Sequence, residues 1–174
     1  MKTDPDLKLI RQSKEGRRAA FGKLVRKYQD PIFELVYDYL GNYEEARDTA
    51  QDVFMKAFNR LGSFEEKARF STWLYRIAVN QSLDVIRKKE RQKLILNREK
   101  REPADQDDTT SRNGAIDLDQ AGLSEAQHTA IILRFFQDMS VPEIAEIMDC
   151  SESTVRTHVY RAVNKLRRQT EFRP

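Results

Sequence analysis

The sequence contains few of the residues that cross-link a chain or interrupt its helices: 1 cysteine, 6 glycines and 5 prolines among 174 residues. The lone Cys150 cannot form a disulfide within the chain. The scarcity of glycine and proline argues against a turn-rich sheet protein, and a content of 39% hydrophobic and 34% charged residues favours helices. We therefore predict an all-α protein whose length suits one ordinary domain or two small ones.

Long hydrophobic segments are also missing. No run approaches the ~20 apolar residues that a membrane-crossing helix needs, so we expect no membrane insertion. Charged residues stand among the first positions of the chain, where a signal peptide would lead into an apolar core. Together with the single cysteine, this pattern predicts a cytoplasmic location.

Residues typical of catalytic or metal sites are equally sparse. His128 and His158 fall in separate predicted helices, and neither forms a zinc-binding spacing with Cys150. The sequence shows no glycine-rich phosphate loop and no arrangement of a nucleophile with a base. We predict no metal, no cofactor and no enzymatic activity.

Positive charge is concentrated, although the formal net charge is only +3. One basic block comprises Arg87, Lys88, Lys89, Arg91, Lys93, Arg98, Lys100 and Arg101, and a second comprises Arg156, Arg161, Lys165, Arg167, Arg168 and Arg173. An acidic stretch separates them. Because Lys and Arg neutralise backbone phosphates, two separate basic patches indicate two separate contacts with nucleic acid.

Apolar residues recur at helical spacing in the N-terminal half of the chain, which we interpret as a helical domain at residues 1–92. The predicted helices are a short one around Ala20–Tyr28, a second after Pro31, a third capped by Asn42 and a long fourth one opening at Ser71. Residues 62–69 break the pattern and are expected to form a loop.

The helical pattern is lost in residues 93–121, which are rich in Asp and Thr and cannot bury enough apolar surface to fold alone. We interpret this segment as an acidic flexible linker. A second domain is expected at residues 122–174, with helices at about Ser124–Gln137, Pro142–Met148 and Ser151–Arg168. Without a partner, the two domains should be either mobile or packed together.

The last two predicted helices form a helix-turn-helix. In the final helix, Val155, Val159, Ala162 and Leu166 share one face, and the opposite face carries Arg156, Thr157, Tyr160 and Arg161. Such a helix can enter the major groove, where arginine pairs with guanine and threonine contacts base edges. The alternative is an ordinary helical hairpin with a solvated basic face.

The segment LSEAQHTAIILRFFQDMSVPEIAEIMDCSESTVRTHVYRAVNKLRR resembles region 4 of the extracytoplasmic-function (ECF) sigma factors of the sigma-70 family, which reads the minus-35 promoter element. The resemblance implies DNA contacts from Ser153, Arg156, Thr157, Tyr160 and Arg161. Asp149 stands where the family usually has a glycine. Aspartate tolerates left-handed backbone geometry, so the turn is still expected to form.

Two further segments, RDTAQDVFMKAFNRLGSF and FSTWLYRIAVNQSLDVIRKKER, resemble region 2 of the same family. The resemblance implies that the third helix docks on the β′ clamp of RNA polymerase through Asp48, Gln51, Asp52 and Phe54. From the residues alone, the acidic stripe on this helix is most simply a solvated face, which is the commonest fate of such charges. A carboxylate metal site would need a Glu-x-x-His pairing, which is absent.

The fourth predicted helix mixes aromatic side chains with cations, a combination that suits binding of an opened DNA strand. The resemblance implies that this helix and the loop before it read the minus-10 element, with Phe64 and Asn80 around a flipped base. The candidate residues are Phe64, Arg76, Asn80, Asp84, Arg87 and Lys88. Trp73 is better interpreted as a core residue, and Phe64 could instead fasten the loop to the core.

The resemblance to both regions, in this order, implies a transcription initiation factor without catalytic activity. Its implied partners are core RNA polymerase, through the β′ clamp and β subunits, promoter DNA and an anti-sigma factor. A stand-alone helix-turn-helix regulator is the alternative, and it would explain only the C-terminal half. The two hypotheses differ in whether the chain associates with core polymerase.

Overall fold

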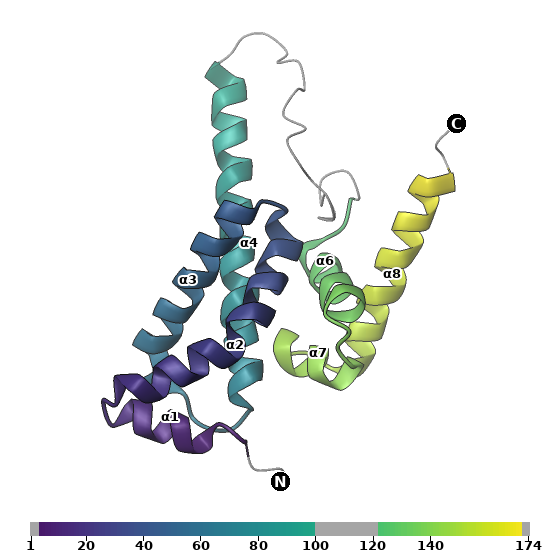
Figure 1. Cartoon of the computed structure of the whole chain (residues 1–174). Helices are drawn as coiled ribbons and strands as arrows, with labels where there is room; N and C mark the ends of the chain where they lie inside the picture. Colours follow the sequence, from purple (N-terminus) through teal and green to yellow (C-terminus); the bar gives the residue numbers. More distant parts are fainter. Residues whose placement is uncertain (1–3, 100–121, 172–174) are drawn as a thin grey trace.

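The computed structural model describes residues 4–99 and 122–171, and helices make up the regular structure throughout these ranges. Figure 1 shows two groups of helices side by side, an N-terminal bundle and a smaller C-terminal group. The prediction of an all-α protein with two helical domains is confirmed. Residues 100–121 of the predicted linker lie outside the described residues.

The N-terminal bundle consists of α1 (Leu7–Lys14), α2 (Arg18–Leu40), α3 (Tyr43–Arg60), a 3-10 turn η1 (Leu61–Ser63) and α4 (Phe70–Glu99). Helix α2 is central, since it packs against α1, α3 and α4. The core between these helices contains fully buried Leu24, Leu35, Val53 and Leu74. Burial of such side chains, rather than helix propensity, supplies most of a bundle's stability.

Helix α2 is continuous where the sequence predicted two helices separated by Pro31. Proline lacks the N–H that would bond to the carbonyl one turn earlier, which favours a break. Here Leu24 precedes and Ile32 and Leu35 follow Pro31, and all three are fully buried in the same core. Packing of both halves against the bundle offsets the missing hydrogen bond.

Helix α1 was not predicted, because its segment is mostly polar and places only Ile10 fully in the core. Polar contacts fix it to α2. The buried carboxylate of Asp6 accepts hydrogen bonds from Lys27 Nζ at 2.6 Å and from the hydroxyl of Tyr28 at 2.5 Å. Burial and this bond raise the pKa of Tyr28, so the hydroxyl keeps its proton.

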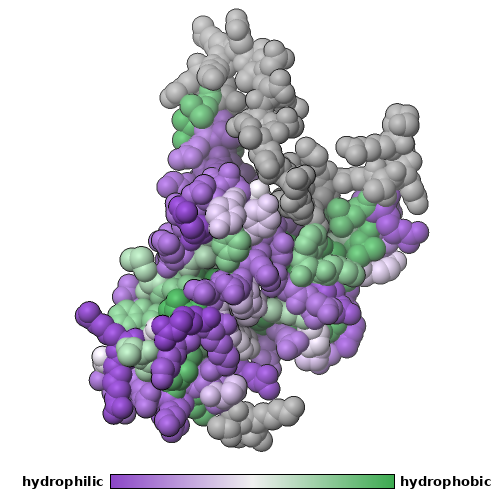
Figure 2. Space-filling view, viewed as in Figure 1, coloured by the Kyte–Doolittle hydropathy of each residue, from purple (hydrophilic) through white to green (hydrophobic). Residues whose placement is uncertain are grey.

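Helix α4 begins at Phe70, where the Asp4 carboxylate accepts the backbone N–H at 2.6 Å. It continues past the expected domain boundary at residue 92 to Glu99. The added segment is rich in Lys, Arg, Glu and Leu, which favour helix even without tertiary contacts. Figure 2 shows apolar surface near its projecting end, where Leu94, Ile95 and Leu96 are exposed.

The C-terminal domain consists of α6 (Glu125–Ile131), a π-helical turn η2 (Ile132–Phe136), α7 (Val141–Met148) and α8 (Glu152–Glu171). Ser124 and Ser140 each form a capping box, with Gln127 and Glu143 respectively. Both α6 and α7 pack against α8. The helix predicted to reach Gln137 is therefore present, but it widens into a π turn at Ile132.

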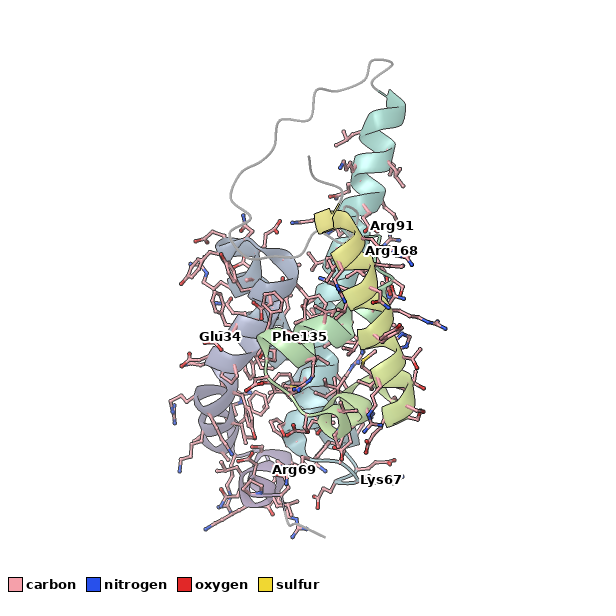
Figure 3. All side chains as sticks on the ribbon, turned by 90° about the vertical axis from the view of Figure 1, so that its right-hand side faces the viewer. Glu34, Lys67, Arg69, Arg91, Phe135 and Arg168 are labelled. Atoms are coloured by element: carbon pink, nitrogen blue, oxygen red, sulfur yellow. The ribbon has the colours of Figure 1, made fainter. Side chains whose placement is uncertain are left out.

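The two domains pack against each other, one of the two arrangements that the sequence allowed. Helix α4 contacts α7, and α2 contacts η2. Between them, the buried hydroxyl of Tyr39 donates to Thr129 Oγ1 at 2.9 Å, and Gln137 Nε2 donates to Asp38 Oδ2 at 2.8 Å. Figure 3 shows η2, which carries Phe135, beside α2.

Candidate nucleic-acid and polymerase interfaces

The turn between α7 and α8 has the geometry of a helix-turn-helix. Asp149 ends α7 in the left-handed conformation, with φ 54°, which confirms the conformation predicted for it. The N–H of Cys150 then bonds to the carbonyl of Ala145 at 3.1 Å. Ser151 Oγ accepts the N–H of Thr154 at 3.1 Å and caps α8, which starts where the sequence pattern predicted.

Helix α8 has an inward and an outward face, as its sequence pattern predicted. Val155 and Ala162 are fully buried. Val159 packs against the hydrophobic cluster that contains Val155, and Leu166 packs against the cluster that contains Ala162. The five candidate minus-35 residues, Ser153, Arg156, Thr157, Tyr160 and Arg161, are all exposed. They lie on one face of α8, which is open to solvent.

Two of these residues have partners within α8. Arg156 Nη2 lies 2.8 Å from Glu152 Oε2, and the Thr157 hydroxyl donates to the carbonyl of Ser153 at 2.9 Å. An exposed ion pair four residues apart on a helix contributes only about 0.3–0.5 kcal/mol, so DNA could replace it at little cost. Glu152 therefore orients Arg156 without blocking it.

The candidate polymerase-binding residues lie together on α3. Asp48, Gln51 and Asp52 are exposed, and Phe54 is half-buried at the edge of their face. Beside them is an apolar groove of about 320 Å³ lined by Phe21, Phe54, Met55, Phe58 and Asn59. The surface therefore combines an acidic stripe with an apolar patch, a composition found at sites of protein association.

The sequence analysis did not identify two residues of this apolar groove as candidate site residues. Met55 is 63% exposed and Phe58 42% exposed, although both side chains are large and apolar. The Phe58 ring packs edge-on against Phe21, with 5.0 Å between centroids. The signal was available in the sequence, because Phe54, Met55 and Phe58 make α3 more apolar than its one buried stripe requires.

The loop before α4 buries Phe64 instead of presenting it to solvent. Only 4% of Phe64 is exposed, and its ring centroid lies 5.9 Å from Phe70 and 5.2 Å from Trp73. Lys14 Nζ donates to the carbonyl of Phe64 at 2.6 Å. The interpretation that Phe64 fastens the loop, and that Trp73 belongs to the core, is therefore favoured in this conformation.

A shallow cleft of about 240 Å³ lies beside this aromatic cluster. It is lined by Ser63, Phe64, Glu65, Lys67, Ala68, Trp73 and Arg76. Phe64 and Trp73 thus contribute to its wall while packing into the core behind it. The cations of Lys67 and Arg76 lie where a nucleic-acid backbone could be held.

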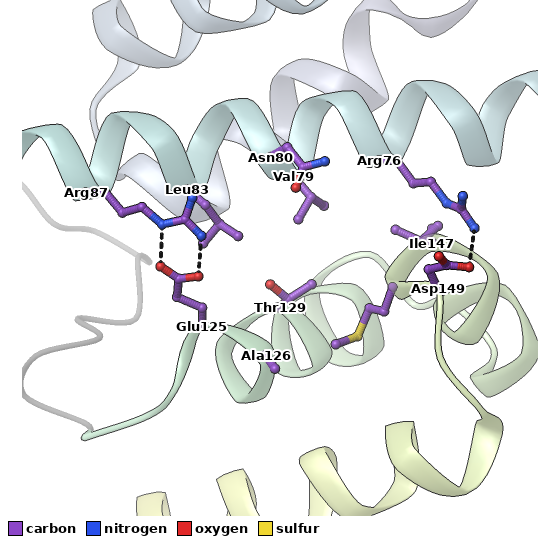
Figure 4. Close-up of a pocket in the computed structure, with 11 residues that line it drawn as sticks. Arg76, Val79, Asn80, Leu83, Arg87, Glu125, Ala126, Thr129, Ile147 and Asp149 are labelled. Carbon is purple, nitrogen blue, oxygen red and sulfur yellow. Dashed lines mark hydrogen bonds and ion pairs between the residues drawn. The ribbon is translucent and has the colours of Figure 1, made fainter. Parts of the chain in front are cut away.

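The remaining minus-10 candidates lie on α4, and most of them face the C-terminal domain. Arg76, Asn80 and Arg87 line a groove of about 470 Å³ between α4 and helices α6 and α7 (Figure 4). Asp84 is exposed and lies 3.1 Å from Arg87 Nη1, and Lys88 is exposed outside the groove. The structure therefore brings three of the candidates together at the domain interface.

Among the residues that line this groove, Arg87 forms the shortest ion pair, with Glu125. Its Nε and Nη2 donate to the two carboxylate oxygens of Glu125 at 2.6 and 2.5 Å. This hydrogen-bonded pairing raises the pKa of Arg87 and lowers the pKa of Glu125. Both groups are consequently charged throughout the neutral range.

Residues 4–99 and 122–171 hold neither a cluster of metal ligands nor a membrane-spanning helix. No group of three or more His, Cys, Asp or Glu side chains there is placed to hold a metal ion. None of the helices in those ranges has both the length and the apolar character needed to cross a membrane.

Comparison with known proteins assigns the two domains to two family models. Residues 24–92 match the model of Sigma-70 region 2, and residues 121–166 match that of Sigma-70 region 4. The chain is 34% identical over 178 residues to the ECF RNA polymerase sigma factor SigW of Bacillus subtilis, covering 93% of this chain and 95% of SigW. It is 33% identical over 184 residues to the RNA polymerase sigma-H factor of Pseudomonas aeruginosa, covering 91% and 90% of the two chains.

Solved structures show the same arrangement of helices. The structure of CnrH in complex with the cytosolic domain of CnrY matches with a TM-score of 0.69 and 25% identity, covering 95% of this chain and 97% of that chain. The sigma factor RpoE in complex with the anti-sigma factor NepR from Bartonella quintana has the same fold, with a TM-score of 0.61 and 24% identity, covering 88% and 98%. Because these matches span nearly the whole chain, they include both helical domains.

Proposed function

The chain belongs to the ECF sigma factors of the sigma-70 family, and on this premise we propose which surfaces perform each step of promoter recognition. As a member of that family, it directs RNA polymerase to promoters and acts by binding rather than by catalysis. The domain at residues 1–92, extended by the end of α4, binds polymerase and the minus-10 element. The domain at residues 122–174 binds the minus-35 element.

The observation that carries this proposal is the presence of two open polar faces on separate domains of one chain. On α8, Ser153, Arg156, Thr157, Tyr160 and Arg161 face solvent above a well-capped helix-turn-helix. This arrangement suits insertion of α8 into the major groove, where Arg156 and Arg161 can reach base edges or phosphates. A stand-alone helix-turn-helix regulator would need only the C-terminal domain, which carries α8.

The second face, on α3, has no role in a stand-alone regulator. Asp48, Gln51 and Asp52 form its polar part, and Phe54 borders the apolar groove with Met55 and Phe58. We assign this surface to the β′ clamp of core polymerase, with the acidic stripe giving orientation and the apolar groove giving buried area. The proposed site of action is therefore the cytoplasm, where polymerase and promoter DNA are found.

The strand-binding surface is assigned to α4 and the cleft beside Phe64. Asn80 offers a donor and an acceptor to a base edge, and Arg76, Arg87 and Lys88 can hold the backbone. Asp84 orients Arg87 through their ion pair. An anti-sigma partner is also proposed, since CnrH and RpoE were both solved with a bound partner.

The test of the polymerase assignment is a double charge reversal, Asp48→Arg with Asp52→Arg. Both carboxylates are exposed, so the fold should be unchanged while affinity for core polymerase falls at least tenfold, because two favourable contacts become repulsive. Glu15→Arg with Asp30→Arg is the matched control, since it reverses two exposed carboxylates at the end of α1 and on α2. Equal affinity of the two double variants for core polymerase would contradict the assignment.

A further inference from the structure

The segment that lines the cleft beside Phe64 is held from behind by α1. We call residues 64–69 the minus-10 loop, because the proposed function assigns this cleft to the minus-10 strand. Figure 1 shows the loop running beside α1 at the lower end of the bundle, where α1 also contacts η1. Helix α1 lies before the residues that match Sigma-70 region 2, which begin at residue 24. The match to region 2 therefore does not assign α1 a role.

Two cations of α1, Arg11 and Lys14, bind the minus-10 loop. Lys14 Nζ donates to the carbonyl of Phe64 at 2.6 Å and lies 5.6 Å from the centroid of the Phe64 ring. Arg11 Nη2 donates to Glu66 Oε2 at 3.1 Å, and Lys14 Nζ lies 4.0 Å from Glu66 Oε1. The hydrogen bond from Arg11 lowers the pKa of Glu66, so this carboxylate is charged at neutral pH. Helix α1 thus holds one backbone group and one side chain of the loop.

The minus-10 loop presents opposite sides to α1 and to the cleft. Glu65 and Lys67 line the cleft and pair with each other at 2.5 Å. Glu66, which stands between them in the chain, directs its carboxylate to Arg11 of α1. Because peptide bonds join Glu66 to both neighbours, its position determines where Glu65 and Lys67 place their side chains. A shift of the loop relative to α1 would therefore reshape the cleft wall.

Glu66 adopts a backbone conformation that glutamate disfavours. Its φ of 60° lies in the left-handed region, where the Cβ atom comes too close to the backbone carbonyl oxygen. Such a residue keeps this conformation only where surrounding contacts outweigh its cost. The ion pairs of Glu66 with Arg11 and Lys14 are contacts of this kind. The shape of the loop thus depends on α1 as well as on its own sequence.

The other end of the loop is fixed by residues that precede α1. Asp4 Oδ2 accepts the N–H of Phe70, the first residue of α4, at 2.6 Å. Asp4 Oδ1 accepts the N–H of Asp6 at 2.9 Å, and the buried Asp6 carboxylate accepts a hydrogen bond from Lys27 of α2. Residues 4–14 therefore hold both ends of the loop while being anchored to the bundle themselves.

We propose that α1 positions the minus-10 loop, with Lys14 and Arg11 setting the shape of the cleft that receives the opened strand. The proposal rests on the proposed assignment of this cleft to the minus-10 strand. Neither cation needs to touch DNA, because Lys14 acts through the carbonyl of Phe64 and Arg11 acts through Glu66. Both are positioning residues, and changing them should alter strand binding while every residue that contacts the strand stays the same.

Loss of these contacts should weaken strand binding by a measurable factor. A charged donor on a backbone carbonyl favours one conformation roughly tenfold or more. An exposed ion pair favours it about two- to fivefold. The apparent affinity for the strand falls with the fraction of molecules whose loop has the binding conformation. Lys14→Met should therefore reduce open-complex formation about three- to tenfold, and Arg11→Gln about twofold.

The position of the loop is measured by acrylamide quenching of Trp73 in the free full-length chain. Trp73 is the single tryptophan of the sequence, and its ring lies 5.2 Å from that of Phe64 between centroids. Quenching should rise in Lys14→Met and return to the parental value in Lys14→Arg, which keeps a charged donor. Lys8→Met is the matched control, since it removes an exposed cation from the same helix. Glu66→Gln, which removes the ion pairs from the loop side, should also raise quenching.

Urea unfolding of the same samples separates positioning from a purely structural role. If Lys14 only stabilises the bundle, Lys14→Met should lower the urea midpoint and leave quenching of the folded state at the parental value. That result would overturn the proposal, as would parental quenching in Glu66→Gln.

Strand binding is measured by permanganate footprinting of a promoter that the parent chain transcribes with core polymerase, at saturating polymerase. Thymine reactivity should fall in Lys14→Met, recover in Lys14→Arg and remain parental in Lys8→Met. Parental reactivity in Lys14→Met would overturn the positioning role alone. Parental reactivity in Arg76→Ala with Asn80→Ala would instead overturn the minus-10 assignment itself, and with it the role of α1 in strand binding, whatever Trp73 reports.

Discussion

Replacing Phe64 by alanine tests whether this side chain is primarily a core residue. The ring is 4% exposed and contacts Phe70 and Trp73 at centroid distances of 5.9 and 5.2 Å. Truncating a buried phenylalanine removes its burial energy and leaves a cavity, at a cost of about 3–5 kcal/mol. Total stabilities of domains are about 5–15 kcal/mol, so the loss should be a large fraction of the whole.

The assay for Phe64→Ala is urea unfolding followed by fluorescence of Trp73, the chain's single tryptophan. Because Trp73 packs against Phe64, its emission reports unfolding of the N-terminal bundle. Asn80→Ala is the control, since Asn80 is exposed and its removal should change stability by no more than about 0.5 kcal/mol. A loss below about 1 kcal/mol in Phe64→Ala would refute the reasoning that the ring is part of the core.

The result also decides how a promoter-opening defect of Phe64→Ala is to be understood. Phe64→Leu keeps most of the side-chain volume and should cost less than about 1.5 kcal/mol. If Phe64→Leu is folded and yet defective in promoter opening, the aromatic ring contributes to holding the opened strand. If it opens promoters normally, the role of Phe64 is to support the loop beside the cleft.

Three further predictions follow from the described surfaces. Arg156→Ala and Arg161→Ala should each weaken minus-35 binding by about 1–3 kcal/mol where a base contact is lost. Where only a phosphate contact is lost, binding should weaken to the same extent on all duplexes. Unchanged binding to both specific and scrambled duplexes would show that α8 is not the recognition helix. Asn80→Ala should impair open-complex formation more than closed-complex binding, as seen by permanganate footprinting of promoter thymines, and normal footprints would assign strand capture to other residues. Because burial and the neighbouring Asp149 carboxylate raise the pKa of Cys150, its thiol should react with iodoacetamide at pH 7.5 more slowly than glutathione, and an equal rate would contradict this.

The elements that local sequence signals specify were predicted correctly. Asn42 accepts the N–H of Glu45 at 3.0 Å and begins α3, as its position before a helical pattern indicated. Ser151 and the spacing of Val155 and Ala162 likewise predicted both the start and the buried face of α8. In each case the cause lies within a few residues of its effect, so the sequence pattern is sufficient.

The elements that depend on distant contacts were missed or misjudged. Helix α1 is held by Asp6, whose partners on α2 are 21 and 22 residues away. Continuity of α2 through Pro31 depends on the shared core rather than on local propensity. Only the folded chain shows these contacts.

For the candidate sites too, features that depend on local sequence were predicted and features that depend on distant contacts were not. The outward face of α8 and the acidic face of α3 could be predicted, since helical periodicity alone determines which residues share a face. The contacts of Arg76 and Arg87 with the C-terminal domain could not be predicted, because Glu125 lies 38 residues beyond Arg87 and Glu146 lies 70 residues beyond Arg76. Burial of Phe64 similarly required the position of Phe70 and Trp73 relative to the loop.

The most direct test of the central claim is association with core RNA polymerase. The full-length chain should co-elute with core polymerase in gel filtration, and the mixture should initiate transcription from promoters that core polymerase alone does not use. Asp48→Arg with Asp52→Arg should weaken both the co-elution and the transcription. Failure to co-elute, combined with sequence-specific duplex binding in the absence of polymerase, would contradict the account and identify a stand-alone helix-turn-helix regulator.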